Sequence, residues 1–282
     1  MYIKSIIGLG SAVIIGLGYG ALHTMHTSPD QSSSSEKVAS KIGVQPNVTY
    51  GSLHDKVPSE KLAESVLSAS VKKQLSSASI KYNNSGAFII DNNKTSLNAS
   101  VKSMPYVQLS NQDQKERPQV ANAFLSQSSR EYRNRQSTGN AKTIDPVGWH
   151  QLSLAKGVVL YNRGHSIGYA LAGSIKGFDA SEANQQNITT QTAWANQSSN
   201  GNAANTGQNY YETLVRKALD KSKTIRIRYR VTPVYDGANL VPSGSHMEAK
   251  SNDGSLEYNI FVPNVQPGVV IDYQTGFARG AK

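Results

Sequence analysis

Apolar residues recur at helical spacing in three parts of the chain and predict three helices. The first follows Pro58 and buries one stripe, made of Leu62, Val66, Leu67, Val71 and Leu75. The second is predicted from Pro118 to about Arg135, because proline is well tolerated in the first turn of a helix. The third covers residues 209 to 220 and buries one face, made of Tyr211, Leu214, Val215 and Ala218.

Shorter apolar runs predict strands. Residues 87 to 91 form a strand followed by a turn, and residues 247 to 261 form a hairpin around the turn Ser251-Asn-Asp-Gly254. Residues 269 to 273 form a last strand. These patterns predict an α+β fold in which helices flank a twisted, mainly antiparallel sheet.

Residues 224 to 231 alternate in polarity and predict a half-buried strand. Ile225, Ile227 and Tyr229 face one side. The other side carries three arginines, Arg226, Arg228 and Arg230. Such a row suits contact with the phosphates of a nucleic acid, and plain solvation of an exposed face explains it equally well.

The first 57 residues differ from the rest of the chain. Residues 5 to 22 are uncharged and apolar, so residues 1–25 are expected to form a membrane anchor, with a cleaved signal segment as the alternative. Lys4 is the charge next to this stretch and favours an N-terminus inside the cell, with the remainder outside. Residues 26–57 are polar and predict a disordered tether, and residues 58–282 form the folded domain.

The charge balance narrows the choice of partners. Lysine and arginine total 29 against 19 aspartate and glutamate residues, which gives a net charge of +10. This excess suits a polyanion such as nucleic acid, or an anionic surface. The chain has no cysteine, so disulfide frameworks and cysteine-based zinc sites are excluded.

The stretch from Leu160 to Tyr169 carries the candidate chemistry. An apolar run at Val158 to Leu160 predicts a strand, and a helix is predicted where Ile167, Leu171 and Ile175 recur. Between them, Arg163 and His165 flank Gly164, which is expected to allow a tight turn. This arrangement suits the presentation of a general base to a phosphodiester, although a single histidine beside glycine is more often structural. His150 is a candidate for a second histidine of the site, but a structural or surface role is favoured for it as well.

Several short motifs point to one family. Asn162-Arg-Gly-His165, together with Asn187-Ile and Ala195-Asn196-Gln, resembles the DNA/RNA non-specific endonucleases with a ββα-metal (His-Me finger) active site. A longer match resembles the membrane-associated DNA-entry nucleases of the EndA type and covers the chain from about Pro58. It includes Phe178-Asp-Ala-Ser, Gln191-Thr-Ala-Trp-Ala-Asn-Gln, Gly207-Gln-Asn-Tyr-Tyr-Glu212 and Leu240-Val-Pro-Ser.

The resemblance implies a role for each matched residue. His165 is the general base, and Asn196 is the direct ligand of Mg²⁺, with Mn²⁺ as an expected substitute. Glu212 holds water around that cation, and Arg216 binds phosphate or stabilises developing charge. Arg163 and Asn187 bind substrate: Arg163 contacts phosphate, and Asn187 also helps to position the site near His165.

The expected function is Mg²⁺-dependent endonuclease activity on DNA and RNA without sequence preference, giving 5′-phosphate products. The nuclease domain is expected outside the cell on a single-pass anchor, with DNA-uptake machinery as one partner. Two alternatives remain. The family usually has aspartate where this chain has Asn162, so a catalytically weakened nucleic-acid-binding protein is one. A secreted scavenging nuclease is the other, if the first segment is cleaved.

Overall fold

The computed structural model describes residues 42–154, 159–199 and 203–281. The predicted anchor (1–25) and the predicted tether as far as residue 41 lie outside these ranges. Within them, no helix combines the length and the apolar character needed to cross a membrane.

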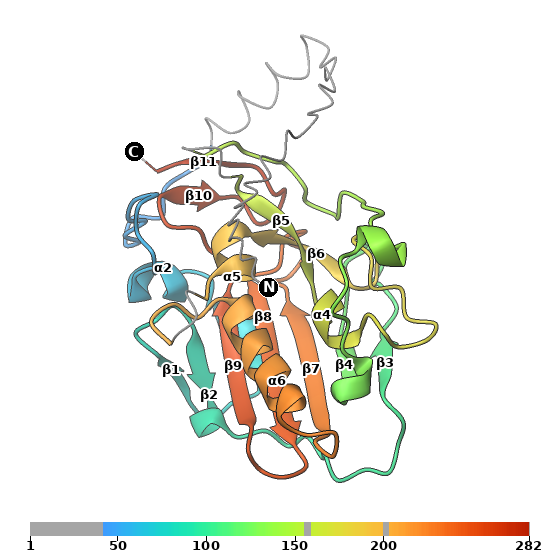
Figure 1. Ribbon diagram of the computed structural model, residues 1–282. Helices are drawn as coiled ribbons and strands as arrows, with labels where there is room; N and C mark the ends of the chain where they lie inside the picture. The colour runs from blue at the N-terminus through green and yellow to red at the C-terminus, as the bar shows by residue number, and fades with distance from the viewer. Residues whose placement is uncertain (1–41, 155–158, 200–202, 282) are drawn as a thin grey trace, which may run out of the picture.

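A seven-stranded sheet forms the centre of the molecule (Figure 1). All of its neighbouring strands pair antiparallel. In spatial order the strands are β1 (Ile80–Tyr82), β2 (Phe88–Ile90), β9 (Glu257–Pro263), β8 (Gly244–Ser251), β7 (Ile227–Val234), β4 (Ala121–Leu125) and β3 (Tyr106–Leu109). The predicted α+β fold with a mainly antiparallel sheet is therefore confirmed.

One long helix, α6 (Gln208–Lys221), lies across a face of this sheet (Figure 1). Its buried residues Tyr211, Val215 and Leu219 share one core cluster with Ile227 and Tyr229 of β7. The helix predicted at residues 209 to 220 is thus confirmed, and its apolar face packs as the pattern indicated.

Two smaller sheets complete the fold. Strand β10 (Val269–Ile271) pairs with β11 (Ala278–Gly280), and β5 (Tyr161–His165) pairs with β6 (Ile188–Thr192). A short helix, α4 (Tyr169–Ala172), follows β5, and α5 (Ala193–Gln197) follows β6 directly. Strands β5 and β6 with α5 form a strand–strand–helix unit, which lies beside one end of α6 (Figure 1).

Other predicted elements are confirmed with small changes. The helix predicted after Pro58 is split into α2 (Glu60–Glu64) and α3 (Ala69–Leu75). The Ser59 hydroxyl accepts a hydrogen bond from the Leu62 N–H in the first turn of α2, and the Ser68 hydroxyl accepts one from the Val71 N–H in the first turn of α3. Each short helix therefore has its own N-cap. The strand near residue 88 and the hairpin β8–β9 lie where the pattern placed them. The strand predicted at residues 269 to 273 is β10, but it is followed by β11 and is not the last strand.

The helix predicted from Pro118 to Arg135 is wrong. Residues 121–125 form strand β4, and only the short 3₁₀ turns η2 (Gln127–Ser129) and η3 (Gln136–Thr138) follow; a third, η1 (Asp91–Asn93), ends β2. Ala121, Ala123 and Leu125 are fully buried in the sheet, so the relevant period is two residues. Pairing with β3 on one side and β7 on the other outweighs the helical preference of the alanines.

The C-terminal part of the predicted tether, residues 42–57, lies against the domain. The carbonyl oxygen of Tyr50 accepts a hydrogen bond of 2.7 Å from the Gly268 N–H. The carbonyl oxygen of Ile42 accepts one of 2.9 Å from Nε of Arg279. The part of the chain that packs on the domain therefore begins earlier than the expected boundary at residue 58.

Candidate active site

The motif Asn162-Arg-Gly-His165 lies within strand β5, where a loop was expected. Gly164 does not make a turn. A Cβ atom at this position would lie 2.0 Å from Oε1 of Gln191 on the neighbouring strand, so glycine is needed for close packing between β5 and β6. The helix predicted after the motif is reduced to the single turn of α4.

His165 stands at the end of β5 and is buried, with 7% of its surface exposed. Its Nε2 lies 3.2 Å from the carbonyl oxygen of Ala180. A carbonyl oxygen only accepts hydrogen bonds, so Nε2 carries the proton of the neutral ring and Nδ1 holds the lone pair. This tautomer is the one that allows Nδ1 to take a proton.

Burial and the positive charge of Arg135 lower the pKa of His165 to about 3, although the carbonyl groups of Ala180 and Arg163 act the other way. His165 is therefore neutral at pH 7. A neutral imidazole is what a general base requires.

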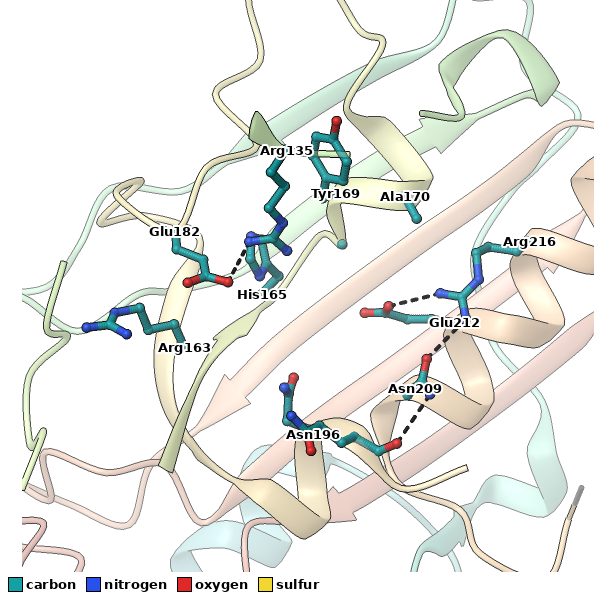
Figure 2. A pocket seen from close by; sticks show the side chains of 12 residues that line it. Arg135, Arg163, His165, Tyr169, Ala170, Glu182, Asn196, Asn209, Glu212 and Arg216 are labelled. Carbon is teal, nitrogen blue, oxygen red and sulfur yellow. Dashed lines mark hydrogen bonds and ion pairs between the residues drawn. The ribbon is translucent and has the colours of Figure 1, made fainter. Parts of the chain in front are cut away.

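A cavity of about 380 Å³ opens beside His165 (Figure 2). It brings together residues from β5, α5 and α6 that lie far apart in the sequence. Five residues predicted from the sequence line it, namely Arg163, His165, Asn196, Glu212 and Arg216.

Glu212 projects from α6 into this cavity. One carboxylate oxygen accepts a hydrogen bond of 2.9 Å from Nε2 of Gln208, and the other lies 3.5 Å from a guanidinium nitrogen of Arg216. Burial raises the pKa of Glu212, while Gln208, Arg216 and Arg135 oppose that rise. A Cβ atom on Gly168 would lie 2.8 Å from this carboxylate, so the glycine makes room for it.

Arg216 reaches from α6 to the floor of the cavity. It donates a hydrogen bond of 3.0 Å to Oδ1 of Asn209 and another to the Thr213 hydroxyl (Figure 2). These two contacts and Glu212 hold the guanidinium near the cavity wall, where it can meet a phosphate group.

Asn187 is fully buried, and its side chain is used entirely by the backbone of Ile167. Its Oδ1 accepts a hydrogen bond of 2.8 Å from the Ile167 N–H, and its Nδ2 donates one of 3.0 Å to the Ile167 carbonyl oxygen. Asn187 therefore fixes the chain just after His165, as the resemblance implies. A direct contact with substrate, the other role predicted for it, is not supported by this position.

Arg163 lies at the edge of the cavity and points away from His165 (Figure 2). It donates a hydrogen bond to the Ile144 carbonyl oxygen and another of 2.6 Å to the Asp145 carboxylate. Its guanidinium carbon also lies 4.7 Å from the centre of the Trp149 ring. These contacts show that Arg163 braces the segment from residue 144 to 149.

Arg226, Arg228 and Arg230 do not reach the cavity. Strand β7 begins at Ile227, three residues later than predicted, so Arg226 precedes the sheet. Ile227 and Tyr229 face α6, and Arg228 and Arg230 therefore project from the opposite face of the sheet. There Arg230 forms a 2.6 Å ion pair with Glu248, whose side chain is 4% exposed. None of these three arginines therefore lines the cavity beside His165.

Arg230→Ser is expected to lower the free energy of unfolding by about 3 kcal/mol, because Glu248 would be left buried and unpaired. In the intact protein burial raises the pKa of Glu248, but hydrogen bonds from Arg230 and Thr95 outweigh burial and lower it. This contribution is therefore present at neutral pH and is lost as the pH falls through the lowered pKa. Urea unfolding at pH 7 and pH 4 measures the effect.

Arg226→Ser is the matched control, since the guanidinium group of Arg226 donates to the backbone carbonyls of Lys223 and Ile225 and forms no ion pair among the described residues. Its substitution should change the free energy of unfolding by less than about 0.5 kcal/mol. Equal losses in both variants would contradict the structural role assigned to Arg230.

Asn162 occupies the face of β5 opposite Arg163 and His165, as strand alternation requires. It does not line the cavity. Its Nδ2 is buried and has no hydrogen-bond partner among the described residues. The departure from the usual aspartate therefore falls behind the catalytic face, with no direct contact to the His165 ring.

Gln208 was missed by sequence reasoning. Its Nε2 donates hydrogen bonds to the His165 carbonyl oxygen (2.5 Å) and to Glu212 (2.9 Å), and its Oε1 accepts one of 3.1 Å from Gln191. One buried amide therefore links β6, the end of β5 and α6. The available signal was its position four residues before Glu212, one helical turn away.

Arg135 was also missed, because it was placed at the end of a helix that does not exist. It forms a 2.6 Å ion pair with Glu182 at the cavity wall and stacks over the Tyr169 ring at 5.3 Å (Figure 2). Its charge acts on both His165 and Glu212. Arg135 is therefore a second cation within reach of a bound phosphate.

Gln208→Glu is expected to lower the free energy of unfolding by about 3 kcal/mol, because both N–H donors are lost and a buried carboxylate is placed against Glu212. The loss should be smaller at pH 5 than at pH 8, since protonating the new carboxyl removes the repulsion. Urea unfolding at the two pH values tests this. Gln185→Glu, the same change at an exposed position, is the control, and a similar loss there would contradict the assignment.

The polar residues of the cavity fit a hard divalent cation. The amide oxygen of Asn196 on α5 and the carboxylate of Glu212 on α6 lie on the same cavity (Figure 2). The described ranges contain no cluster of three or more His, Asp, Glu or Cys residues suited to a metal. A cation held here would keep several water ligands, which is the preference of Mg²⁺.

Comparisons with known proteins agree with this site. A family model described as DNA/RNA non-specific endonuclease matches residues 84–280. The chain is similar to NucA from Streptococcus agalactiae with magnesium bound, at 44% identity over 72% of this chain and 91% of that chain, with a TM-score of 0.66. The metal-free NucA structure gives 42% identity over 79% and 97%, with a TM-score of 0.68.

A more distant similarity concerns the fold alone. The structure of Sda1 nuclease with bound zinc is 20% identical over 62% of this chain and 80% of that chain, with a TM-score of 0.50. All cavity residues named above lie within the segment that the family model matches.

Proposed function

Since this chain belongs to the DNA/RNA non-specific endonucleases, we propose that it is a Mg²⁺-dependent nuclease that hydrolyses DNA and RNA and leaves 5′-phosphate ends. One observation carries the proposal. His165 presents a neutral imidazole, fixed by Ala180 with its Nδ1 unprotonated, to a cavity that also holds Asn196, Glu212 and Arg216.

His165 supplies the proton transfer. Nδ1 takes a proton from a water molecule, whose oxygen attacks the phosphorus atom. The hydrogen bond from Nε2 to the Ala180 carbonyl holds the ring during this step and stabilises the imidazolium that forms. The bond from phosphorus to the 3′-oxygen breaks, and that oxygen takes a proton from solvent water to become a 3′-hydroxyl. The imidazolium of His165 then returns its proton to solvent.

The phosphate charge is met by residues from three elements. Arg216 and Arg135 line the cavity and offer guanidinium groups to the non-bridging oxygens. Asn196 would ligate Mg²⁺ directly, and Glu212 would orient its water ligands. When bound, Mg²⁺ supplies positive charge that stabilises the negative charge developing on the phosphate.

The chemistry of the cavity favours cleavage without sequence preference. The residues that line it are suited to phosphate and solvent, and none is presented on an element that would enter a groove to read base edges. Backbone contacts of this kind treat DNA and RNA alike.

We further propose a position at the outer cell surface. The apolar stretch at residues 5 to 22, the lysine before it and the resemblance to DNA-entry nucleases support an anchored enzyme that acts on incoming DNA. Immunoblotting of membrane and medium fractions separates this proposal from the secreted alternative.

A plasmid-nicking assay tests the activity. Purified protein should convert supercoiled plasmid to nicked and linear forms with Mg²⁺, and EDTA should stop the reaction. Mn²⁺ is expected to substitute. Plasmid binding without nicking, at any concentration of either cation, would overturn the proposal and favour the weakened binding protein.

A further inference from the structure

A second cavity, of about 510 Å³, adjoins the first along the C-terminal end of α5. Gln197 and Asn209 line both cavities, so the two cavities share a wall. The remaining walls come from α5, the segment after it, the chain near residue 266 and the N-terminal segment. Beyond the two shared residues, the lining that matters here is Asp55, Lys56, Trp194, Ser198 and Asn205.

The walls of this second cavity are fixed by specific hydrogen bonds. The carbonyl oxygen of Lys56 accepts from Nε1 of Trp194 (3.1 Å) and from Nδ2 of Asn205 (2.8 Å). The Trp194 N–H donates to Oε1 of Gln266 at 3.0 Å. Residue 56 is thus held against α5 as part of the domain.

The chemistry of the lining suits a nucleotide. Lys56 supplies a cation, and Gln197 and Ser198 supply neutral polar groups. The one acidic residue, Asp55, turns its carboxylate toward the Ser52 N–H, from which it accepts a hydrogen bond of 2.9 Å. A volume of several hundred cubic ångströms matches ordinary small-molecule sites.

The position of the second cavity relative to His165 predicts the 5′-to-3′ direction in which a nucleic-acid strand lies. In phosphoryl transfer the attacking and leaving oxygens are roughly in line, so the 3′-oxygen departs on the side of phosphorus away from His165. Figure 2 shows Asn196 and Asn209 at the end of the first cavity opposite His165. The second cavity continues from that end.

We propose that the second cavity binds the nucleotide on the 5′ side of the cleaved bond, with Lys56 contacting the phosphate next along the strand in the 5′ direction. The inference rests on the proposed function, since it uses His165 as the base and the 3′-oxygen as the leaving group. Beyond the proposed function, it states the 5′-to-3′ direction of the bound strand. It also assigns substrate contact to Lys56, which lies outside the cavity beside His165.

The test uses a thymidine hexanucleotide with and without a 5′-phosphate. At its first linkage, the hexanucleotide with a 5′-hydroxyl lacks the phosphate that Lys56 would bind. Adding the 5′-phosphate should therefore accelerate cutting at the first linkage about tenfold relative to the last linkage. Adding a 3′-phosphate should change that ratio little. Mass spectrometry of early products gives the ratio within one reaction.

Lys56→Gln should remove most of the gain from the 5′-phosphate, whereas Lys61→Gln should keep it, since Lys61 is an exposed lysine of α2 outside both cavities. The inference would be overturned if Lys56→Gln kept the full acceleration by the 5′-phosphate. It would also be overturned if the 3′-phosphate accelerated cutting in place of the 5′-phosphate. Absence of any cleavage by the unaltered protein would instead defeat the proposed function, so the two failures are distinct.

Discussion

Replacing His165 with glycine is expected to reduce phosphodiester cleavage by a factor of about 1,000, because a positioned general base contributes on this order to the rate. DNA affinity should be retained, since Arg135 and Arg216 still line the cavity. Gel-based cleavage rates and fluorescence anisotropy with a labelled oligonucleotide measure the two effects separately.

Free imidazole provides the control for this variant. The glycine leaves a space of the size of the lost ring, and added imidazole should restore part of the rate there. Restoration by imidazole but not by an inert salt of equal concentration would tie the defect to a missing base. A variant that cuts at near-normal rate would show that the histidine is structural.

The pH dependence follows from the same residue. A base acts only when unprotonated, and burial with Arg135 lowers the pKa of His165 well below its usual value of about 6.5. The rate should therefore persist as the pH falls through 6.5 and decline only at lower pH. Circular dichroism at each pH separates this decline from unfolding. A decline centred above pH 6.5 would contradict the environment described for His165.

Asn196→Ala is expected to reduce Mg²⁺-dependent cleavage by about 100-fold, because the direct protein ligand of the cation is lost. The fold should be preserved, since Asn196 is half-buried at the cavity and its neighbours Trp194 and Ala195 supply the core contacts of α5. Titration calorimetry with Mg²⁺ and the Mg²⁺ dependence of cleavage report the loss directly.

The conservative variant Asn196→Asp keeps an oxygen at the same place and should retain cleavage within about tenfold of the unaltered protein. An unaffected rate in Asn196→Ala at limiting Mg²⁺ would remove Asn196 from the metal site.

Sequence patterns predicted an element correctly where its apolar residues followed a single period. Helix α6 and the hairpin β8–β9 carry apolar residues at a single period, and the structure buries those residues. Residues 118 to 135 failed because alanine suits a helix locally, whereas the sheet needed a strand between β3 and β7. That choice depends in part on β7, which lies more than 100 residues further along the chain, and local periodicity does not report such a partner.

The site divides in a similar way. His165, Asn196, Glu212 and Arg216 were recognised from short motifs, and the fold brings all four to one cavity. Gln208 and Arg135 were not recognised, because their importance lies in contacts made across elements. Arg228 and Arg230 were correctly placed on one face of a strand, whereas Arg226 precedes that strand. Periodicity alone does not say which face of the strand meets the cavity.

The hydrogen bond between Arg279 and Ile42 joins the last strand to the first described residues of the chain. The two ends of the folded domain therefore lie side by side, which is the condition for circular permutation. A short linker could connect residue 281 to residue 42, with new ends opened in a surface segment far from His165. Because Lys56 is held by Trp194 and Asn205, such a rearranged chain is expected to keep the second cavity without residues 1–41.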